Sequence, residues 1–373
     1  MLALGPNLYR LPECSRSPRP ESPTVDPAPQ RETVKLGERK ASWITDAIAI
    51  AQFVGSGILY KDAADAAAEH QKEHPPLSDA PVVKLDDPFL ILPGWTTRPE
   101  KFDNLVAHLL KNPDNGSRAV YLREEKAYSD KECTQLTEVG ESDKVFVCVY
   151  DNVLSPPDKT APQIADAVGL IKGVHGEKVD VLGYSMGGTA VRQMLNQDLQ
   201  KVDQVAFLGT SHLGSRFAAL ANYVIHRDIK FAMKLAGVNA AHLPAMQWMM
   251  PLNPEKPESS PQLAALNANL DRQLENCTEA FNIGSDGFAT ITLPWGKAEG
   301  GDGLVHGTSS RLEGIPGVTL QGRGNKQHGN LPSDTDAFKE LAGFYGWSPV
   351  SDSAPVPPVA ASTFPATGEE APS

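Results

Sequence analysis

Short apolar runs alternate with amphipathic segments through the middle of the chain. The apolar runs cover residues 88–94, 144–151, 179–185, 202–210, 289–295 and 318–324. Segments with helical spacing, such as 101–112 and 161–174, separate most of them. Continuous apolar runs of this length predict strands that are buried on both faces. The pattern therefore predicts an α/β fold with a doubly wound, mostly parallel sheet.

The alternating pattern is absent from both ends of the chain. Residues 1–40 are rich in Pro, Ser, Arg and Glu, which predicts a flexible leader, and residues 41–80 are predicted to form a helical segment. The α/β domain is predicted over residues 81–348. Residues 349–373 are predicted to be a disordered Pro/Ala/Ser tail. The apolar stretch 47–60 is too short to span a bilayer, so no transmembrane segment is predicted.

Composition narrows the possible partners and location. Hydrophobic residues make up 40% of the chain and charged residues 21%, which is typical of a soluble globular protein. The formal net charge of −12 argues against a nucleic-acid partner, because phosphate binding requires a basic surface. The N-terminus has no apolar core of the kind found in secretory signals, so a cytoplasmic location is the default expectation.

The four cysteines give no indication of a metal site. Cys14, Cys133, Cys148 and Cys277 are scattered and have no zinc-binding spacing. Cys148 lies in an apolar run, which predicts a buried, inert thiol. A disulfide between Cys133 and Cys277 is an open alternative.

One predicted strand ends at a serine that stands between glycines. In "VDVLGYSMGGTA" (179–190), Ser185 is flanked by Gly183 and Gly187, and a helical pattern follows. This strand–turn–helix context is the one required for a nucleophile elbow, in which small neighbours permit a strained backbone at the serine. A tight turn that contains a serine by chance is the alternative. The context favours a nucleophile.

A nucleophilic serine needs a base, and the base needs an acid to orient it. His328 fits the base because it follows the last predicted strand and precedes a helical pattern, whereas His306 precedes that strand and His212 would reverse the expected order. For the acid, Asp302 follows the predicted strand 289–295. Asp286 precedes this strand and should therefore lie at the wrong edge of the sheet. Asp302 is thus predicted to be the acid, with a structural turn aspartate as its alternative role.

Several separated stretches resemble bacterial lipases and esterases of the α/β-hydrolase superfamily. The stretches are "GYSMGG", "FLILPGW", "GTSHLGS" (209–215), "GDGLVHGTSS" and "SSPQLAALN" (259–267), and the resemblance covers about residues 85–347. In "GTSHLGS", Ser211 stands where these lipases usually have proline. The resemblance implies an α/β-hydrolase fold. It also implies an oxyanion hole made by the backbone N–H groups of Met186 and Trp95.

The resemblance further implies a helical lid or cap, inserted at about residues 215–262. This region contains "MQWMM", with Met246, Trp248, Met249 and Met250. We expect these side chains to contribute to a mobile lid with an apolar underside, and Trp248 to be its interfacial anchor. Packing in the core of a fixed cap is the alternative.

Together these features predict a serine hydrolase that cleaves carboxylic esters through an acyl-enzyme, as a lipase or long-chain esterase. The expected substrate is a small-molecule or lipid ester, and contact with a lipid interface is a further expectation. No cofactor and no metal, calcium included, are predicted. A thioesterase or acyltransferase with the same triad is one alternative, because fold does not determine chemistry. A hydrolase-like binding module without catalysis is the other.

Overall fold

The computed structural model describes residues 75–253, 259–290, 299–321 and 326–350, together with Asp65 and Glu69. The chain divides into two units, Met1–Asp46 and Ala47–Ser373, and every described residue belongs to the second. The predicted leader 1–40, most of the helical segment 41–80 and all but the first two residues of the tail 349–373 lie outside the described residues.

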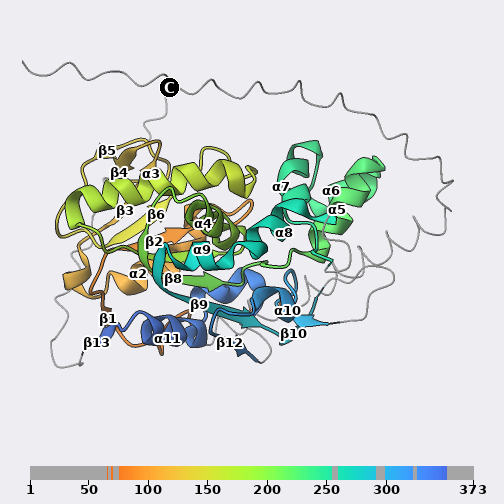
Figure 1. The fold of residues 1–373 in the computed structure, drawn as a ribbon. Helices are drawn as coiled ribbons and strands as arrows, with labels where there is room; N and C mark the ends of the chain where they lie inside the picture. The colour runs from red at the N-terminus through yellow and green to blue at the C-terminus, as the bar shows by residue number, and fades with distance from the viewer. Residues whose placement is uncertain are drawn as a thin grey trace, which may run out of the picture. The chain divides into compact units, whose positions relative to one another are not determined.

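A nine-stranded sheet forms the centre of this unit (Figure 1), in the order β12-β9-β8-β7-β2-β6-β3-β4-β5. Neighbouring strands from β12 to β3 pair in parallel, while β3, β4 and β5 pair antiparallel at one edge. The bounds are β2 Phe89–Leu92, β3 Ala119–Arg123, β4 Lys126–Tyr128, β5 Leu136–Thr137, β6 Val145–Cys148, β7 Asp180–Tyr184, β8 Val202–Leu208, β9 Cys277–Ser285 and β12 Gly317–Leu320. The predicted doubly wound, mostly parallel sheet is confirmed.

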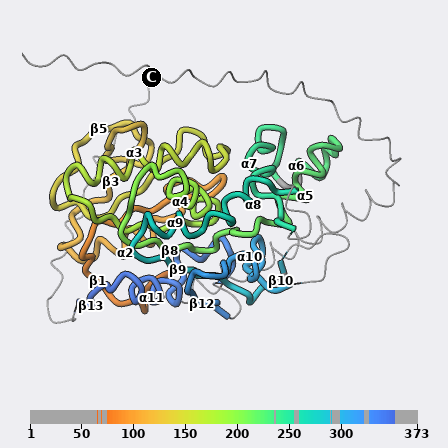
Figure 2. Tube along the Cα trace, viewed as in Figure 1, coloured from red at the N-terminus to blue at the C-terminus, as the bar shows by residue number. Residues whose placement is uncertain are grey.

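Helices cover both faces of the sheet (Figure 2). On one face lie η1 (Pro99–Phe102), α2 (Asp103–Leu109) and α11 (Thr335–Phe344), and on the other lie α3 (Pro157–His175), α4 (Met186–Asn196) and α9 (Leu270–Leu274). Successive residues of a strand point to opposite faces. In β2, Phe89 and Ile91 therefore join the first layer, whereas Leu90 and Leu92 join the second. Burial on both faces explains why these strands are continuously apolar.

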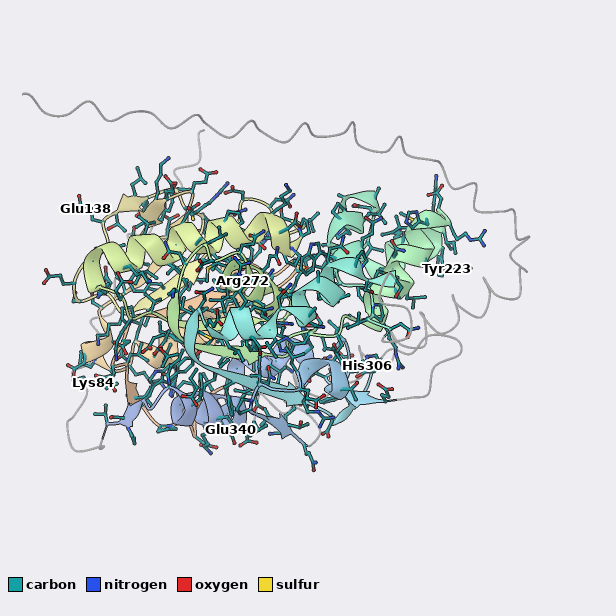
Figure 3. The ribbon with its side chains drawn as sticks, in the orientation of Figure 1. Lys84, Glu138, Tyr223, Arg272, His306 and Glu340 are labelled. Atoms are coloured by element: carbon teal, nitrogen blue, oxygen red, sulfur yellow. The ribbon has the colours of Figure 1, made fainter. Side chains whose placement is uncertain are left out.

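A group of helices with its own apolar cluster lies beyond the carboxyl ends of the strands (Figure 1). It consists of α5 (Arg216–His226), α6 (Lys230–Ala236), η3 (Ala240–His242), α7 (Leu243–Trp248) and α8 (Pro261–Ala268). In Figure 3, Tyr223 marks α5, while Glu138 marks the opposite end of the unit, next to β5. The helices from α5 to α7 occupy the predicted insertion at 215–262. We call the segment 215–250 the cap.

Short elements complete the unit. They are η2 (Pro113–Asn115), a two-stranded pair of β1 (Val83–Lys84) with β13 (Ser348–Pro349), a second pair of β10 (Phe288–Ala289) with β11 (Gly300–Gly301), and α10 (Gly307–Ser310). No helix among the described residues is both long and apolar enough to cross a membrane. Residues 113–143 contribute η2, β3, β4 and β5.

The main-sheet strand that was expected at residues 289–295 lies earlier in the chain. The strand of the main sheet is β9, Cys277–Ser285, whereas Phe288–Ala289 forms only the short β10, and residues 291–298 lie outside the described residues. The first half of β9 is largely solvent-exposed, so its sequence lacks the continuous apolar pattern of the central strands. Asp286 consequently follows the carboxyl end of β9, and the reason for excluding it as the acid was incorrect. The disulfide considered between Cys133 and Cys277 is not formed, since both thiols are free.

The close packing of β7 against α4 makes a prediction about stability. A Cβ on Gly183 would lie 2.5 Å from Gly188 Cα, whereas a Cβ on Gly173, in the exposed end of α3, would meet nothing within 4 Å. Gly183→Ala should therefore lower the free energy of unfolding by about 1–3 kcal/mol. Gly173→Ala, the matched control, should raise it by about 0.5–1 kcal/mol through helix propensity. Urea denaturation of both variants tests this; equal effects would contradict the packing argument.

Candidate active site

Ser185 occupies a strained bend between β7 and α4. Its φ of 55° and ψ of −128° place it in a region that residues with a side chain rarely adopt. Its N–H donates to Leu208 O at 2.9 Å, which ties the bend to the end of β8. Helix α4 begins at the next residue, so the serine hydroxyl stands at the helix N-terminus, at the carboxyl edge of the sheet.

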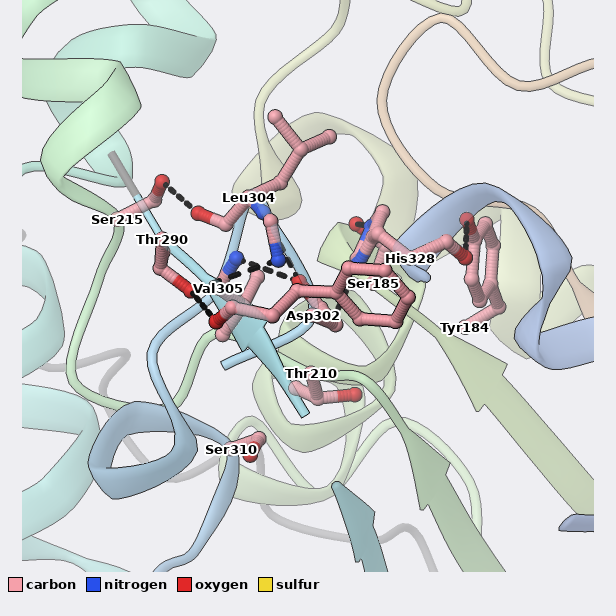
Figure 4. Close-up of polar contacts among 12 residues, drawn as sticks. Tyr184, Ser185, Thr210, Ser215, Thr290, Asp302, Leu304, Val305, Ser310 and His328 are labelled. Carbon is pink, nitrogen blue, oxygen red and sulfur yellow. Dashed lines mark hydrogen bonds and ion pairs between the residues drawn. The ribbon is translucent and has the colours of Figure 1, made fainter. Parts of the chain in front are cut away.

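The loop after β11 brings a carboxylate to this serine, and the loop after β12 brings an imidazole (Figure 4). His328, the first residue of η5 (His328–Ser333), places Nε2 at 2.9 Å from Ser185 Oγ. Asp302, which follows β11, places Oδ2 at 2.6 Å from His328 Nδ1. The structure thus brings together the three residues that the sequence predicts to form a triad.

The surroundings of Asp302 determine how the imidazole carries its proton. Asp302 is fully buried, and its Oδ1 accepts the backbone N–H groups of Leu304 at 3.0 Å and Val305 at 2.7 Å. The other oxygen faces His328, and an ionised carboxylate can only accept. His328 Nδ1 therefore donates to Asp302, which leaves Nε2 free to accept the proton of Ser185.

Main-chain contacts hold His328 in this position. Its N–H donates to Asp302 O at 2.8 Å, and its carbonyl accepts the Tyr184 hydroxyl at 2.8 Å. The Tyr184 ring also lies against the imidazole, with centroids 5.1 Å apart. Since Tyr184 is the residue before the serine, the same strand end positions both Ser185 and His328.

The loop after β2 lies directly against the serine. A Cβ on Gly94 would lie only 2.7 Å from Ser185 Cβ and 3.2 Å from its Oγ, so no side chain fits there. The backbone N–H groups of Trp95 and Met186 have no hydrogen-bond acceptor among the described residues. Two unpaired donors beside a nucleophile can bind a developing negative charge. This arrangement agrees with the oxyanion hole expected from the sequence resemblance.

A small pocket of about 50 Å³ opens above the serine. Its lining is mainly apolar, and the cap contributes Phe217, Ala218, Met246 and Met249. The remaining lining residues are Trp95, Ser185, Met186, Ser211, Ser215, Leu304, Val305 and His328. Of the four residues predicted for the lid, two therefore face this pocket. Trp248 is buried and instead lines a separate hollow of about 540 Å³, and Met250 lines neither space.

Asp286 does not occupy the acid position, even though it lies at the same edge of the sheet as Asp302. It packs against Gly300 and Gly307, and the carboxylate that contacts His328 is that of Asp302. His212 also lies apart from Ser185: it is fully buried and contacts Arg192 and Asn282.

Sequence reasoning missed several residues that shape the site. Leu304 and Val305 orient the acid through their N–H groups, and Ser211, Ser215 and Phe217 line the pocket. Ser211 and Ser215 lie within "GTSHLGS", and Phe217 follows it closely. The motif could therefore have indicated the position of these three residues, but not their contacts. Among the described residues, no group of three or more His, Cys, Asp or Glu side chains could hold a metal ion.

Comparisons with known proteins give fold-level likenesses only. No family model matches the chain, and no curated protein matches it. Among solved structures, the product of lin2722 from Listeria innocua covers 69% of this chain and 93% of its own, at 13% identity and a TM-score of 0.46. The mature lipase BlEst2 of Bacillus licheniformis covers 73% of this chain and 94% of its own, at 16% identity and a TM-score of 0.43. The metagenomic carboxyl esterase MGS0156 covers 71% of this chain and 76% of its own, at 12% identity and a TM-score of 0.38.

The chain is similar to these proteins in architecture. The α/β-hydrolase fold expected from the sequence motifs agrees with the parallel sheet, the bend at Ser185 and the position of the site at the carboxyl ends of the strands.

Proposed function

We propose that this protein is a serine hydrolase that cleaves carboxylic esters, with Ser185 as nucleophile, His328 as base and Asp302 as the acid that orients it. The observation that carries the proposal is the continuous hydrogen-bonded chain Ser185–His328–Asp302, with distances of 2.9 and 2.6 Å. A serine hydroxyl is a weak nucleophile unless a base removes its proton, and this geometry supplies the base.

The reaction follows from the positions of these groups. His328 Nε2 takes the proton of Ser185 as Oγ attacks the ester carbonyl, and Asp302 stabilises the imidazolium that forms. The carbonyl oxygen becomes negative, and the free N–H groups of Met186 and Trp95 stabilise it. The imidazolium then protonates the departing alcohol, which leaves an acyl-enzyme on Ser185. Water, activated by His328 in the same way, releases the acid.

The apolar residues of the cap favour a substrate with an apolar acyl group, and the small size of the pocket favours a closed resting form. The pocket of about 50 Å³ is far smaller than typical ligand pockets of roughly 300–1,000 Å³. We therefore propose that the cap is a lid that opens before an acyl chain binds. Met246, Met249 and Phe217 would then line the acyl site with apolar surface.

Trp95 connects this lid to the proposed oxyanion hole. Its ring lies 5.9 Å from that of Phe217 on α5 and 5.3 Å from that of His242 on η3. Its indole N–H is buried and has no hydrogen-bond partner among the described residues, which costs free energy in the closed form. Opening the lid would expose this donor to water or to substrate, and this favours a lid over a fixed cap.

A thioesterase or acyltransferase would use the same triad, and the comparison of a thioester with an oxygen ester of the same acyl chain distinguishes these activities. A binding module without catalysis is disfavoured, because binding alone has no need for an aligned base and acid.

The nucleophile is tested by Ser185→Ala, which removes the only atom proposed to form the acyl-enzyme. Hydrolysis of p-nitrophenyl butyrate should fall by about 10⁴-fold or more, with circular dichroism unchanged. Ser129→Ala, at an exposed serine next to β4, is the matched control and should retain full activity. Substantial hydrolysis by a folded Ser185→Ala protein would exclude this nucleophile.

The acid is tested by comparing two aspartates at the same edge of the sheet. Asp302→Asn should lower kcat by about 10⁴-fold, because an amide cannot hold His328 in the required tautomer or stabilise the imidazolium. Asp286→Asn is the matched control and should change kcat less than about threefold. Steady-state kinetics on a soluble ester decide the matter; a larger loss at Asp286 would assign the acid role to that residue.

The lid is tested with an insoluble long-chain ester. Activity should rise sharply above the aggregation point of the substrate, because an apolar interface favours the open form by its differential affinity. Trp248 is buried in the closed form, so it would reach the interface as the proposed anchor only once the lid opens. Trp248→Ala should therefore reduce this rise and spare a soluble short-chain ester. Simple saturation across the aggregation point, with equal loss on both substrates in the variant, would show a fixed cap.

A further inference from the structure

Arg192 on α4 is a fully buried cation, about 1% exposed, and its hydrogen bonds go to neutral groups. Nε donates to Gln273 Oε1 at 2.9 Å, Nη2 to Asn267 Oδ1 at 2.8 Å and Nη1 to His212 Nδ1 at 3.2 Å. Burial lowers the pKa of Arg192 to about 9, so the guanidinium is still charged at neutral pH.

Stability alone does not account for an arginine at this position. Burying a charge is costly, and a well-packed apolar side chain of similar volume is often equal or better for stability. The described partners of Arg192 include no carboxylate that would offset the cost. A functional role for the three guanidinium donors of Arg192 is therefore the better explanation.

Because an arginine can only donate, it fixes the orientation of each partner. His212 must accept at Nδ1, so its Nε2–H donates to Asn282 Oδ1 at 2.8 Å. Burial, followed by the charge of Arg192, holds the pKa of His212 well below its usual value, which keeps the ring neutral. Asn267 accepts from Arg192 through Oδ1, and its Nδ2 donates to His212 O at 3.1 Å. The network thus holds both the ring and the carbonyl of His212.

His212 lies at the centre of loop 209–215, which joins the parts of the proposed active site. At one end, a Cβ on Gly209 would lie 3.2 Å from Asp302 Oδ2 and 3.3 Å from His328 Nδ1. The hydroxyl of Thr210 donates to Gly183 O in β7 at 3.2 Å. At the other end, the Ser215 hydroxyl donates to Leu304 O, next to the acid, at 2.9 Å (Figure 4). A shift of this loop would therefore displace the acid loop relative to the nucleophile.

We propose that Arg192 is a positioning residue for the triad: through His212 and Asn267 it holds loop 209–215 so that Asp302 and His328 stay aligned with Ser185. The inference rests on the proposed function of these three residues. Arg192 would contribute to kcat without touching the substrate, since no part of it lines the pocket above Ser185.

The test variant is Arg192→Lys, which keeps a long side chain with a nitrogen donor but cannot donate to three separate acceptors in a planar fork. Active-site titration with a fluorophosphonate counts the competent molecules, and kcat is expressed per titrated site. We expect kcat per site to fall about 10–100-fold, the cost of a small misplacement, with KM changed less than about threefold. A merely structural role would lower the number of titrated sites and leave kcat per site unchanged.

Asn115→Ala is the matched control. Asn115 is also fully buried, and its side-chain amide is fully hydrogen-bonded: Oδ1 accepts the Leu85 N–H, and Nδ2 donates to Val83 O and Leu109 O. It lies in η2, away from the active site. This variant should lose stability and keep wild-type kcat per titrated site.

Hydrogen exchange separates this inference from the proposed function, because it requires no activity. The N–H groups of His212 and Leu213 bond to Ser309, and their exchange should be at least about tenfold faster in Arg192→Lys and unchanged in Asn115→Ala. Wild-type kcat per site in folded Arg192→Lys, or unaltered exchange in these amides, would overturn the proposal. Failure of the wild-type protein to react with fluorophosphonate would instead refute the proposed function, and exchange alone would then decide whether Arg192 holds the loop.

Discussion

The strained backbone of Ser185 is the constraint on which the rest of the site depends. A residue with a side chain persists at φ 55° and ψ −128° only where its neighbours enforce the conformation. One enforcing contact comes from the end of β8, where Leu208 O accepts the Ser185 N–H. The other comes from the loop after β2, where Gly94 packs so closely against Ser185 that no side chain would fit between them. The close contact of Gly183 in β7 with Gly188 in α4 also restrains the bend, because it fixes the strand against the helix on either side of Ser185. The strain is therefore balanced by the packing of these neighbouring segments, and it places the serine hydroxyl above the strand ends, in the pocket beneath the cap.

Parallel strand order explains how residues far apart in sequence meet at this hydroxyl. The carboxyl ends of β7 and β2 supply the proposed nucleophile and the two N–H groups of the proposed oxyanion hole, and loops beyond β9 and β12 supply the proposed acid and base. Loop 209–215, which follows β8, lies between these two groups and contacts both. The site is thus assembled from five neighbouring strands, so its geometry depends on loops as much as on the sheet.

Much of this arrangement could be predicted from the sequence, because the central strands are buried on both faces and their apolar runs are continuous. Ser185 was predicted from its place after such a strand, and His328 from its place after the edge strand β12, which is only partly buried. The strand β9 was missed because its first half is exposed, so its pattern is mixed. Asp302 was consequently predicted from an incorrect strand position, although it is the carboxylate that contacts His328. The network around Arg192 has no sequence pattern of its own, because its members are separated by up to 90 residues and meet only in the folded chain.

The proposed mechanism requires Ser185 to attack a carbonyl whose oxygen is held by the backbone N–H groups of Met186 and Trp95. A crystal structure of the protein after reaction with a fluorophosphonate tests nucleophile and oxyanion hole together. We expect a covalent bond from phosphorus to Ser185 Oγ, with the phosphoryl oxygen about 2.7–3.1 Å from the backbone nitrogens of both residues. Phosphorus on another side chain, or an oxygen directed away from both nitrogens, would contradict it.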